Sequence, residues 1–365
     1  MSLLSPSKRR SSSSCPVDRV EVFARTIPTD EPESDGTLEW DSTTIVVVQA
    51  HANGAVGLGY TYTHDAAARL IEDKLAPAAR GVDVTGDLSS AWHEMGDLLR
   101  NVGRPGMGFM ALSAVDIALW DLKARVLGQP LVDVLGGVRD EAAVYGSGGF
   151  TSYSLDRLSE QLGGWVANGI SRVKMKVGRD EDADPARLTA ARDAIGNDAE
   201  LYVDANGAYS HKQALAWAER FAQEWGVTWF EEPVSSADFT GLRHVRKRAE
   251  LDVAAGEYAY VPADFRNLLD AGAVDCLQVD VTRCGGYTGF LHAAGLAEQY
   301  GLQVSAHCAP QVSAHVCCAI PHFRHIEYFH DHVRVERQLF EGVLEPVGGA
   351  LRPDRSRAGH GLELK

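Results

Sequence analysis

The sequence predicts an α/β protein: a modified (β/α)₈ barrel that follows a smaller N-terminal α+β domain. Two observations lead to this prediction. Between residues 141 and 334, eight short apolar segments alternate with helical stretches, which is the pattern of a closed parallel barrel. Near the ends of these segments polar residues return at intervals of one strand and one helix, as they do where barrel strands open into a shared site.

The N-terminal part is expected to begin with a disordered leader, residues 1–16, which is basic and Ser-rich and lacks the apolar segment of a signal peptide. Residues 17–26 and 43–50 favour strands because they are rich in β-branched side chains. The acidic, turn-rich residues 27–41 between them predict a long loop. The other elements expected before the barrel are a strand and loop at 54–64 and helices at 65–80, 87–102 and 109–128.

We therefore assign residues 17–140 to the first domain and 141–334 to the barrel. Residues 335–365 are too long for the last barrel helix alone, so we expect this tail to pack back onto the first domain and complete it. The predicted barrel strands are AAVYGSG (142–148), RVKMKVG (172–178), LYVDAN (201–206), TWFEEPV (228–234), DVAAGE (252–257), CLQVDV (276–281), LQVSAH (302–307) and HIEYF (325–329).

The composition favours a cytoplasmic protein that acts on a small molecule. Its formal net charge of −15 argues against nucleic acid, whose binding needs a basic face, whereas a metal and a few lysines suffice to attract an anionic substrate locally. No apolar run approaches the roughly 18 residues of a membrane helix. The six cysteines form no C-x-x-C pair, which indicates reduced thiols rather than a disulfide framework.

Polar residues punctuate the predicted strands near their carboxyl ends. They are Lys174, Lys176, Asp204, Asn206, Glu231, Glu257, Asp280, His307 and Glu327. With one residue taken per strand, the intervals from Lys176 to His307 are 28, 27, 26, 23 and 27 residues. Because each interval is one strand–helix repeat, these side chains should return to one mouth of the barrel.

Asp204, Glu231 and Glu257 are the candidate metal ligands. Three carboxylates that converge in one mouth repel each other unless a cation lies between them, and hard oxygen ligands suit Mg²⁺ or Mn²⁺. Glu232 follows Glu231 directly and should point to the opposite face of the strand unless the strand end bulges.

The candidate acid/base groups are Lys176 and His307. Lys174 and Lys176 share a face of their strand, and a divalent cation beside them should lower the lysine pKa, as a general base requires. Asp280 lies one repeat before His307 and could fix the tautomer of its ring. His330 and His332 follow the last strand, close enough to the mouth to be considered as substrate contacts.

Taken together, the chain resembles the enolase superfamily, in its mandelate racemase branch, from about residue 17 to the end. The segments that carry the resemblance are ALSAVDIALWDLKARVLGQPLVDVLGG (111–137), VKMKVG, YVDANGAYS, WFEEP, AAGE, VDVTRCGGYTG, SAHCAP and HIEY. The resemblance implies Mg²⁺ on the three carboxylates, Lys176 as base on one face of a carboxylate substrate, and His307 with Asp280 on the other.

The resemblance also implies substrate contacts. Lys174 and Glu327 would hold the substrate carboxylate, Asn206 would touch its hydroxyl, and Ser147 would be a further contact. Residues 17–140 would be a capping domain, with 27–41 and 57–64 as substrate-gating loops. The assembly would be a homo-oligomer, a dimer or an octamer.

Within the superfamily, the aspartate at position 280 argues against muconate cycloisomerases and dipeptide epimerases, which carry a lysine there. The resemblance favours dehydration of an acid sugar to a 2-keto-3-deoxy acid; the alternative is a racemase or epimerase of an α-hydroxy acid. A hypothesis of another class is a catalytically silent binding protein on the same barrel. Residues 27–41 offer no obvious anion-binding side chain, which favours a monocarboxylic over a dicarboxylic sugar acid.

Overall fold

The computed structural model describes residues 14–365. Most of the predicted leader, residues 1–13, lies outside the described residues. The prediction that the leader extends to residue 16 is wrong, because Cys15 is buried and its backbone N–H donates to Oδ1 of Asp83 at 2.9 Å. Pro16 forms a β-bridge with the same aspartate, so the ordered chain begins before Val17.

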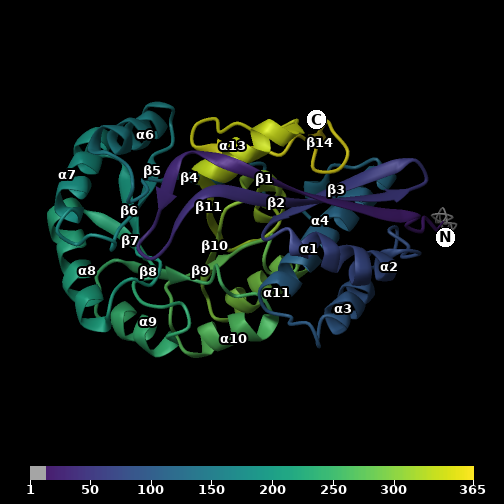
Figure 1. The fold of residues 1–365 in the computed structure, drawn as a ribbon, viewed down its shortest axis with the longest axis horizontal. Coiled ribbons are helices and arrows are strands. Elements are labelled where there is room, and N and C mark those ends of the chain that lie inside the picture. The colour runs from purple at the N-terminus through teal and green to yellow at the C-terminus, as the bar shows by residue number, and fades with distance from the viewer. Residues whose placement is uncertain (1–13) are drawn as a thin grey trace, which may run out of the picture.

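The capping domain is built on a three-stranded antiparallel sheet in the order β1 (Arg19–Ser34), β2 (Glu39–Ala52), β3 (Ala55–Tyr62). The loop predicted at 27–41 is instead the far half of a long β1–β2 hairpin, whose pairing is irregular only between Pro28 and Glu33. Polar, turn-forming residues are compatible with these strands because much of this hairpin half is exposed. In Figure 1 the hairpin leaves the capping domain and crosses the barrel.

Helices cover one side of this sheet. They are α1 (Ala66–Leu70), a π-helical turn η1 (Ile71–Leu75), α2 (Ala76–Ala79), α3 (Ser89–Leu98), α4 (Met107–Leu127) and α5 (Leu131–Val134). The long α4 packs against β3 so closely that a Cβ at Gly57 would lie 2.2 Å from the Ala118 carbonyl oxygen, and one at Gly59 equally close to that of Ala114. These two glycines therefore set the distance between helix and sheet.

The barrel contains eight parallel strands, and β11 pairs with β4 to close the ring. The strands are β4 (Ala142–Gly148), β5 (Arg172–Lys176), β6 (Glu200–Asp204), β7 (Val227–Glu231), β8 (Asp252–Ala255), β9 (Cys276–Val279), β10 (Gln303–Ala306) and β11 (Phe323–Phe329). The helices are α6 (Leu155–Ala167), α7 (Asp184–Ile195), α8 (His211–Trp225), α9 (Phe239–Arg246), α10 (Pro262–Asp270), α11 (Gly286–Gln299), α12 (Pro310–Cys317) and α13 (His330–Leu339). All eight strands lie at the positions that the sequence predicts.

The tail after α13 contacts both parts of the molecule. Its strand β13 (Ala350–Leu351) pairs antiparallel with β4 of the barrel, while β12 (Phe340–Glu341) pairs with β14 (Glu363–Leu364). Nε2 of His360 lies 2.7 Å from the carbonyl oxygen of Leu58 in the capping domain. The same strand, β3, reaches α13, because the Tyr60 hydroxyl donates to Oε1 of Glu336 at 2.6 Å.

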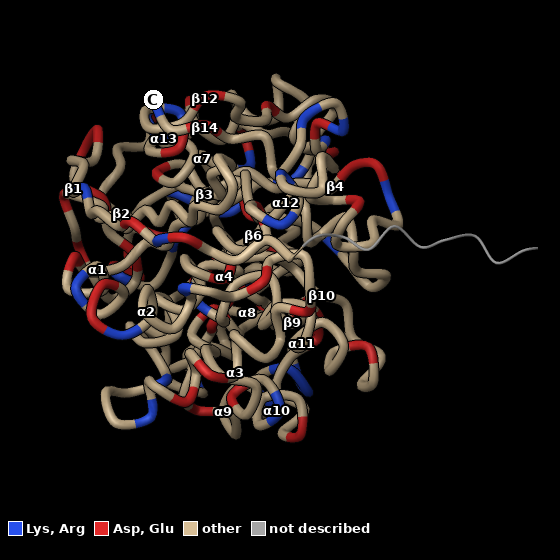
Figure 2. The backbone as a smooth tube through the Cα atoms, turned by 90° about the vertical axis from the view of Figure 1, so that its right-hand side faces the viewer, with Lys and Arg blue, Asp and Glu red and all other residues tan. Residues whose placement is uncertain are grey.

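Acidic and basic residues are interspersed along the outer helices and loops (Figure 2). Within residues 14–365, none of the helices combines the length and the apolar character needed to cross a bilayer. All six cysteines are buried and none forms a disulfide.

Candidate active site

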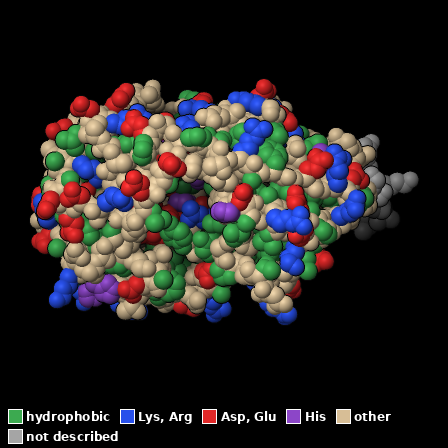
Figure 3. Space-filling model, in the orientation of Figure 1, with side chains coloured by type: hydrophobic (Ala, Val, Ile, Leu, Met, Phe, Trp, Pro, Cys, Tyr) green, Lys and Arg blue, Asp and Glu red, His purple; other side chains and the backbone are tan. Residues whose placement is uncertain are grey.

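The strand ends meet in a hollow beneath the β1–β2 hairpin, and basic (Lys or Arg) and histidine side chains are visible in a central depression of the face shown in Figure 3. The predicted polar residues all lie at this end of the barrel. Ser147, Lys174, Lys176, Asp204, Glu231 and Glu327 end their strands or lie near the ends, and Asn206, Glu257, Asp280 and His307 lie just beyond theirs. All except Asn206 are buried.

Lys174 is surrounded by carboxylates. Its Nζ lies 2.8 Å from Oε1 of Glu327 and 3.3 Å from Oδ2 of Asp204, and it also pairs with Oε1 of Glu231. Burial by itself would lower the pKa of Lys174, but Glu231 and Glu327 outweigh it and raise the pKa well above its usual value. Lys174 is therefore a permanent cation in this structure.

The pKa of Lys176 is predicted to fall when a divalent cation lies beside it; without the ion, its surroundings raise the pKa instead. Its Nζ lies 2.5 Å from Oδ2 of Asp204. Burial favours the neutral amine, but the Asp204 carboxylate outweighs this effect and raises the pKa above its usual value. The physical reason is direct pairing, because an ammonium in contact with a carboxylate keeps its proton.

His307 is held between two carboxylates. Its Nδ1 lies 2.7 Å from Oδ2 of Asp280, and its Nε2 lies 2.8 Å from Oε2 of Glu257. The other oxygen of Asp280 accepts hydrogen bonds from the backbone N–H and the hydroxyl of Thr282, both at 2.7 Å. Asp280 is thus fixed from one side and orients the imidazole from the other, which leaves Nε2 directed into the mouth.

A left-handed backbone follows three of the strand ends. Asn206, Glu232 and Cys308 have φ values of 45°, 38° and 50°. Adjacent strand residues normally point to opposite faces, so Glu232 was expected to face away from the mouth. Instead its carboxyl is buried, and after burial itself the strongest influence that raises its pKa is the charge of Glu257. The distorted strand end therefore turns the Glu232 side chain into the mouth, as it could only do if the strand end departed from regular geometry.

Four residues near the mouth were not singled out from the sequence as site residues. The Arg283 guanidinium lies 3.3 Å from Oδ2 of Asp280 and 3.7 Å from Oε1 of Glu257, so its single positive charge partly offsets both. Glu232, Cys308 and Tyr62 also lie at the site. Two features of the sequence could have pointed to these residues: the Glu-Glu dipeptide and the position of Arg283 three residues after Asp280. The backbone turns decide which of these side chains enter the mouth.

The two histidines that follow β11 have different environments. His332 is buried, its Nδ1 accepts a hydrogen bond from the Ala309 N–H at 3.2 Å, and its ring stacks on Tyr62 of the capping domain. His330 turns away and lies 3.0 Å from Oδ2 of Asp30 on the hairpin. Only His332 therefore belongs to the wall of the mouth.

The capping domain contributes a hairpin and a fixed wall. The hairpin tip is seated on the strand ends: Oγ of Ser34 lies 2.6 Å from Oγ1 of Thr151, and a Cβ at Gly36 would lie 2.4 Å from the Ala205 carbonyl oxygen. Residues 57–64, by contrast, are mostly the buried strand β3 rather than a loop. The Thr61 hydroxyl donates to the Thr282 carbonyl at 2.7 Å, so the prediction of a gating loop there is wrong.

The predicted ligands do not converge on one point. Within residues 14–365, Asp204, Glu231 and Glu257 do not bring one oxygen each within 4.8 Å of the others. The lysines attract the first two, and His307 attracts the third. These competing pairs account for the spread of the three carboxylates.

The charges nevertheless fit a divalent cation. The buried carboxyl side chains at the mouth are Asp204, Glu231, Glu232, Glu257, Asp280 and Glu327, and the permanent cations are Lys174, Lys176 and Arg283. With all six ionised, the carboxylates would exceed the cations by three charges, and a protonated His307 would reduce the excess to two. Burial raises the pKa of Glu231 to about 8 and that of Glu232 well above its usual value, so a divalent cation among them would be needed to keep both ionised. Oε1 of Glu232 and Oδ1 of Asn206 are buried and have no hydrogen-bond partner among residues 14–365, so oxygen ligands also remain available.

The chain matches two family models. Residues 20–136 match the mandelate racemase/muconate lactonizing enzyme N-terminal domain, and residues 157–365 match the enolase C-terminal domain-like model. A mandelate racemase/muconate lactonizing enzyme-like protein from Rubrobacter xylanophilus has a solved structure that superposes with a TM-score of 0.94 at 58% sequence identity, covering 96% of this chain and 97% of that one.

Two further relatives have named activities. The 3,6-anhydro-α-L-galactonate cycloisomerase of Streptomyces coelicolor is 31% identical over 351 residues, which are 95% of this chain and 96% of the relative. The L-talarate/galactarate dehydratase of Salmonella typhimurium LT2, solved with Mg and L-lyxarohydroxamate, superposes with a TM-score of 0.88 at 28% identity and covers 100% of this chain and 95% of that one. The chain belongs to the mandelate racemase/muconate lactonizing enzyme family of the enolase superfamily.

Proposed function

We propose that this protein is a Mg²⁺-dependent dehydratase of an acid sugar, which removes water across C2 and C3 and releases a 2-keto-3-deoxy acid. The observation that carries the proposal is the pairing of two different acid/base groups across one mouth, Lys176 on β5 and the Asp280-held His307 after β10. The talarate/galactarate dehydratase that it resembles over its whole length supports the same reaction class.

In this proposal Asp204, Glu231 and Glu257 bind Mg²⁺, with Mn²⁺ as the alternative ion, because the mouth gathers buried carboxyl groups whose ionised forms a divalent cation would stabilise. When bound, the ion supplies positive charge to the substrate carboxylate as negative charge develops there. The magnesium in the structure of the Salmonella dehydratase is consistent with this assignment.

Lys174 and Glu327 are proposed to hold the substrate carboxylate. The Lys174 ammonium is fully buried and paired with Glu327 at 2.8 Å, so it provides a fixed positive charge at the bottom of the mouth. Ser147 donates its hydroxyl to Oε1 of Glu327 at 2.6 Å, which makes it a support for Glu327 in this structure as well as a candidate contact. Asn206, with its unpartnered Oδ1, is proposed to bind a substrate hydroxyl.

The reaction then needs two proton transfers. Lys176 takes the proton from C2, and its amine must be neutral when it does so, which requires Asp204 to be drawn away from its Nζ. The electrons left at C2 form the C2–C3 double bond as the C3 hydroxyl departs. His307 gives that hydroxyl the proton on Nε2, so that it leaves as water, and the resulting enol becomes the 2-keto acid.

A racemase would use the same two residues differently. His307 would then return a proton to C2 on the face opposite Lys176, and the C3 hydroxyl would stay. The strand positions of Lys176 and His307 suit either reaction, so the product decides between them. A silent binding protein on this barrel is disfavoured because every acid/base position holds a competent side chain.

The hairpin tip favours a monocarboxylic substrate. It places two buried carboxyls, those of Glu33 and Asp35, near the strand ends. Burial raises the pKa of Glu33 to about 8. A second carboxylate at the far end of a substrate would meet the Asp35 carboxyl and a Glu33 carboxyl that must stay protonated beside it, whereas sugar hydroxyls could donate hydrogen bonds to both groups.

The test is a panel of five- and six-carbon aldonic and aldaric acids, incubated with Mg²⁺ and assayed for keto product with semicarbazide. We expect at least one aldonic acid to give a 2-keto-3-deoxy acid that has lost one water, and negligible racemisation of mandelate. Inversion or exchange at C2 without any keto acid would replace the dehydratase with a racemase. A product of unchanged mass formed by opening or closing a ring would indicate a cycloisomerase. Absence of α-proton exchange in D₂O for every acid tested would support a binding protein.

Compartment and assembly also belong to the proposal. We infer a cytoplasmic enzyme from the six free cysteines and a homo-oligomer, a dimer or an octamer, from the family resemblance. Light scattering of the purified chain tests the assembly, and a monomeric mass at micromolar concentration would contradict it.

A further inference from the structure

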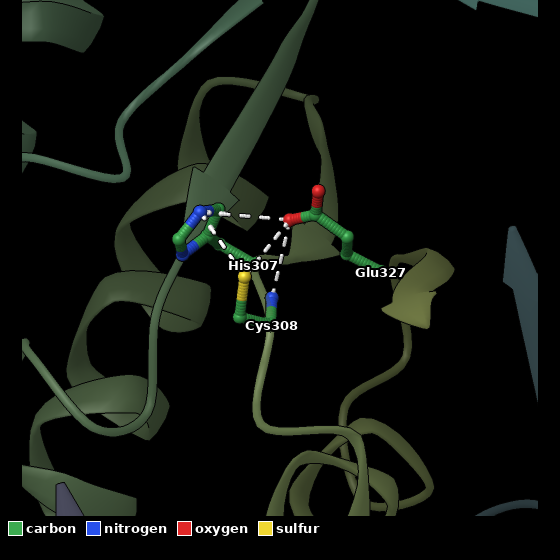
Figure 4. Close-up of side chains that lie close together, drawn as sticks. All are labelled: His307, Cys308 and Glu327. Carbon is green, nitrogen blue, oxygen red and sulfur yellow. Dashed lines mark hydrogen bonds and ion pairs between the residues drawn. The ribbon is translucent and has the colours of Figure 1, made fainter. Parts of the chain in front are cut away.

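One group of side chains at the mouth includes a donor, the Cys308 thiol, that the proposed reaction does not need. Cys308 is buried beside His307, and Figure 4 shows both side chains turned towards Glu327. Sγ of Cys308 lies 3.3 Å from Nε2 of His307 and 3.3 Å from Oε2 of Glu327, and Nε2 lies 3.5 Å from the same oxygen. A nitrogen, a sulfur and an oxygen thus form a compact triangle.

The local backbone creates this triangle. Residues next to each other in a strand point to opposite faces, so Cys308 should face away from His307. Cys308 and Ala309 instead have φ values of 50° and 42°, which non-glycine residues adopt only at a cost. The turn brings the thiol back to the imidazole, while the backbone N–H of Cys308 also lies 3.3 Å from Oε2 of Glu327.

The triangle has the dimensions of one face of a tetrahedral zinc site. Bonds of about 2.0–2.1 Å to nitrogen, 2.3 Å to sulfur and 2.0–2.2 Å to oxygen give edges of roughly 3.3–3.5 Å between nitrogen and oxygen and roughly 3.5–3.7 Å from sulfur to either. The observed nitrogen–oxygen separation of 3.5 Å lies in its range, and the two sulfur separations of 3.3 Å are shorter than theirs by roughly 0.2 Å. The ligands would need little movement to accept the ion.

Neighbouring side chains also orient the donor atoms of His307 and Glu327. Asp280 holds Nδ1 of His307 at 2.7 Å, which is the carboxylate–histidine support common at metal sites. Lys174 and Ser147 occupy Oε1 of Glu327, at 2.8 and 2.6 Å, and leave Oε2 directed at the thiol. Within residues 14–365, the two groups of at least three potential ligands that come this close are this one and Asp30–Glu33–His330, and only this one contains a thiol.

We propose that His307, Cys308 and Glu327 form a second, inhibitory metal site for a soft divalent cation of the Zn²⁺ class. The proton of the Cys308 thiol and the proton on Nε2 of His307 would both leave to solvent as Sγ and Nε2 bind the ion. Thiolate and imidazole ligands select Zn²⁺ or Co²⁺ over Mg²⁺, whereas the carboxylates on the other side of the mouth favour the hard ion. Because the ion would occupy Nε2 of His307, it would block the proton transfer assigned to that residue; this inhibitory consequence rests on the proposed function, but the binding does not.

The experiment titrates Co²⁺ into the full-length protein saturated with Mg²⁺ and without substrate. Mg²⁺ is added first because Glu257, a proposed Mg²⁺ ligand, lies 2.8 Å from Nε2 of His307 and could otherwise compete for the soft ion. We expect a thiolate-to-Co²⁺ charge-transfer band in the near ultraviolet, which Zn²⁺ then abolishes by displacement. A Co²⁺ ion that replaced Mg²⁺ on the carboxylates would give no such band, and that outcome would overturn the proposal.

Two cysteine variants test whether Cys308 supplies the thiolate that binds the ion. Cys308→Ser should lose the band and bind Zn²⁺ at least about tenfold more weakly, since even the loss of a residue that supports a metal ligand costs roughly 10- to 100-fold in affinity. Cys276→Ser is the matched control, because this thiol is also buried but donates to the Gln303 carbonyl in the structure. A band that survives Cys308→Ser, or that is lost equally in Cys276→Ser, would contradict the assignment.

A measurement on the unmodified protein tests the site without depending on whether a variant folds. X-ray absorption at the zinc edge of the Mg²⁺- and Zn²⁺-loaded protein should show one sulfur at about 2.3 Å, and a shell of oxygen and nitrogen alone would refute the site. Zn²⁺ should then also inhibit turnover with Mg²⁺ in excess. Binding without inhibition would count against the role of His307 in the proposed reaction while leaving the metal site intact.

Discussion

Oδ2 of Asp280 lies 2.7 Å from Nδ1 of His307, and both side chains are buried. The aspartate fixes which ring nitrogen faces the mouth. Burial disfavours the charged imidazole, but Cys308, Glu257 and Glu327 outweigh it and raise the pKa of His307 well above its usual value. In this structure these contacts favour the protonated imidazole, which is the form that an acid for the departing hydroxyl requires.

We predict that the activity depends on a divalent cation held in part by Glu257. Glu257→Gln keeps the volume of the side chain but removes one negative charge from the mouth. Its kcat should fall by at least about 100-fold, the order found when one electrostatic stabiliser is removed from an active site, while circular dichroism stays unchanged. Full turnover in excess EDTA, or full turnover of the variant, would disprove the metal assignment.

Lys176 and His307 should fail in different partial reactions. Lys176→Ala should abolish exchange of the C2 proton with D₂O for substrates of one configuration and lower kcat by roughly 10²- to 10⁴-fold. His307→Asn should block water loss by a similar factor but retain part of the exchange, because the base is still present. Exchange followed by NMR separates the two steps, and identical behaviour of both variants would refute the division of roles.

The hairpin tip should control access to the mouth. In Gly36→Ala the new Cβ would lie 2.4 Å from the Ala205 carbonyl oxygen and 2.8 Å from that of Val177, so the tip could not seat on β5 and β6. We expect kcat/KM to fall by about 10- to 100-fold, with the barrel still folded. Gly295→Ala, where nothing lies within 4 Å of the added carbon, is the control and should retain its activity. Equal kcat/KM for both variants would show that tip seating is unimportant.

Stability should depend on pH through Glu336. Burial raises the pKa of this carboxyl to about 8 from an ordinary value of 4.5. Between these pH values the folded protein keeps a proton that the unfolded chain has lost, so the free energy of unfolding should fall as pH rises from about 4.5 to about 8. The loss has an upper limit of about 5 kcal/mol, since each tenfold change in an equilibrium constant is worth about 1.4 kcal/mol.

Glu336→Gln tests this dependence because an amide cannot ionise and its oxygen can still accept the Tyr60 hydroxyl, which lies 2.6 Å from Oε1. Relative to the unmodified protein, the variant should gain stability as pH rises from 5 to 9, measured by urea unfolding at each pH. Glu341→Gln, a change at an exposed position, should show no such gain. Parallel pH profiles for the Glu336 variant and the unmodified protein would contradict the prediction.

The sequence by itself determined the barrel and which polar residues lie at its mouth, because both depend on local, repeating signals. Apolar strands alternating with amphipathic helices fix a parallel barrel, and polar residues spaced by one repeat must reach the same mouth. For this reason the spacing alone was enough to assign Lys174, Lys176, Asp204, Glu231, Asp280 and His307 to that mouth. The resemblance that these residues carry was confirmed by both family models.

Tertiary structure decided what no local pattern encodes. Residues 27–41 look like a loop, but pairing across a long hairpin makes them strands that reach the barrel. The left-handed backbone at Glu232 and Cys308 turns two side chains into the mouth that strand alternation would have turned away. The raised pKa of Lys176 follows from contact with Asp204, which lies 28 residues along the chain. Each of these features depends on where distant segments meet, because the charge state and direction of a buried side chain are set by its neighbours in space rather than by its neighbours in sequence.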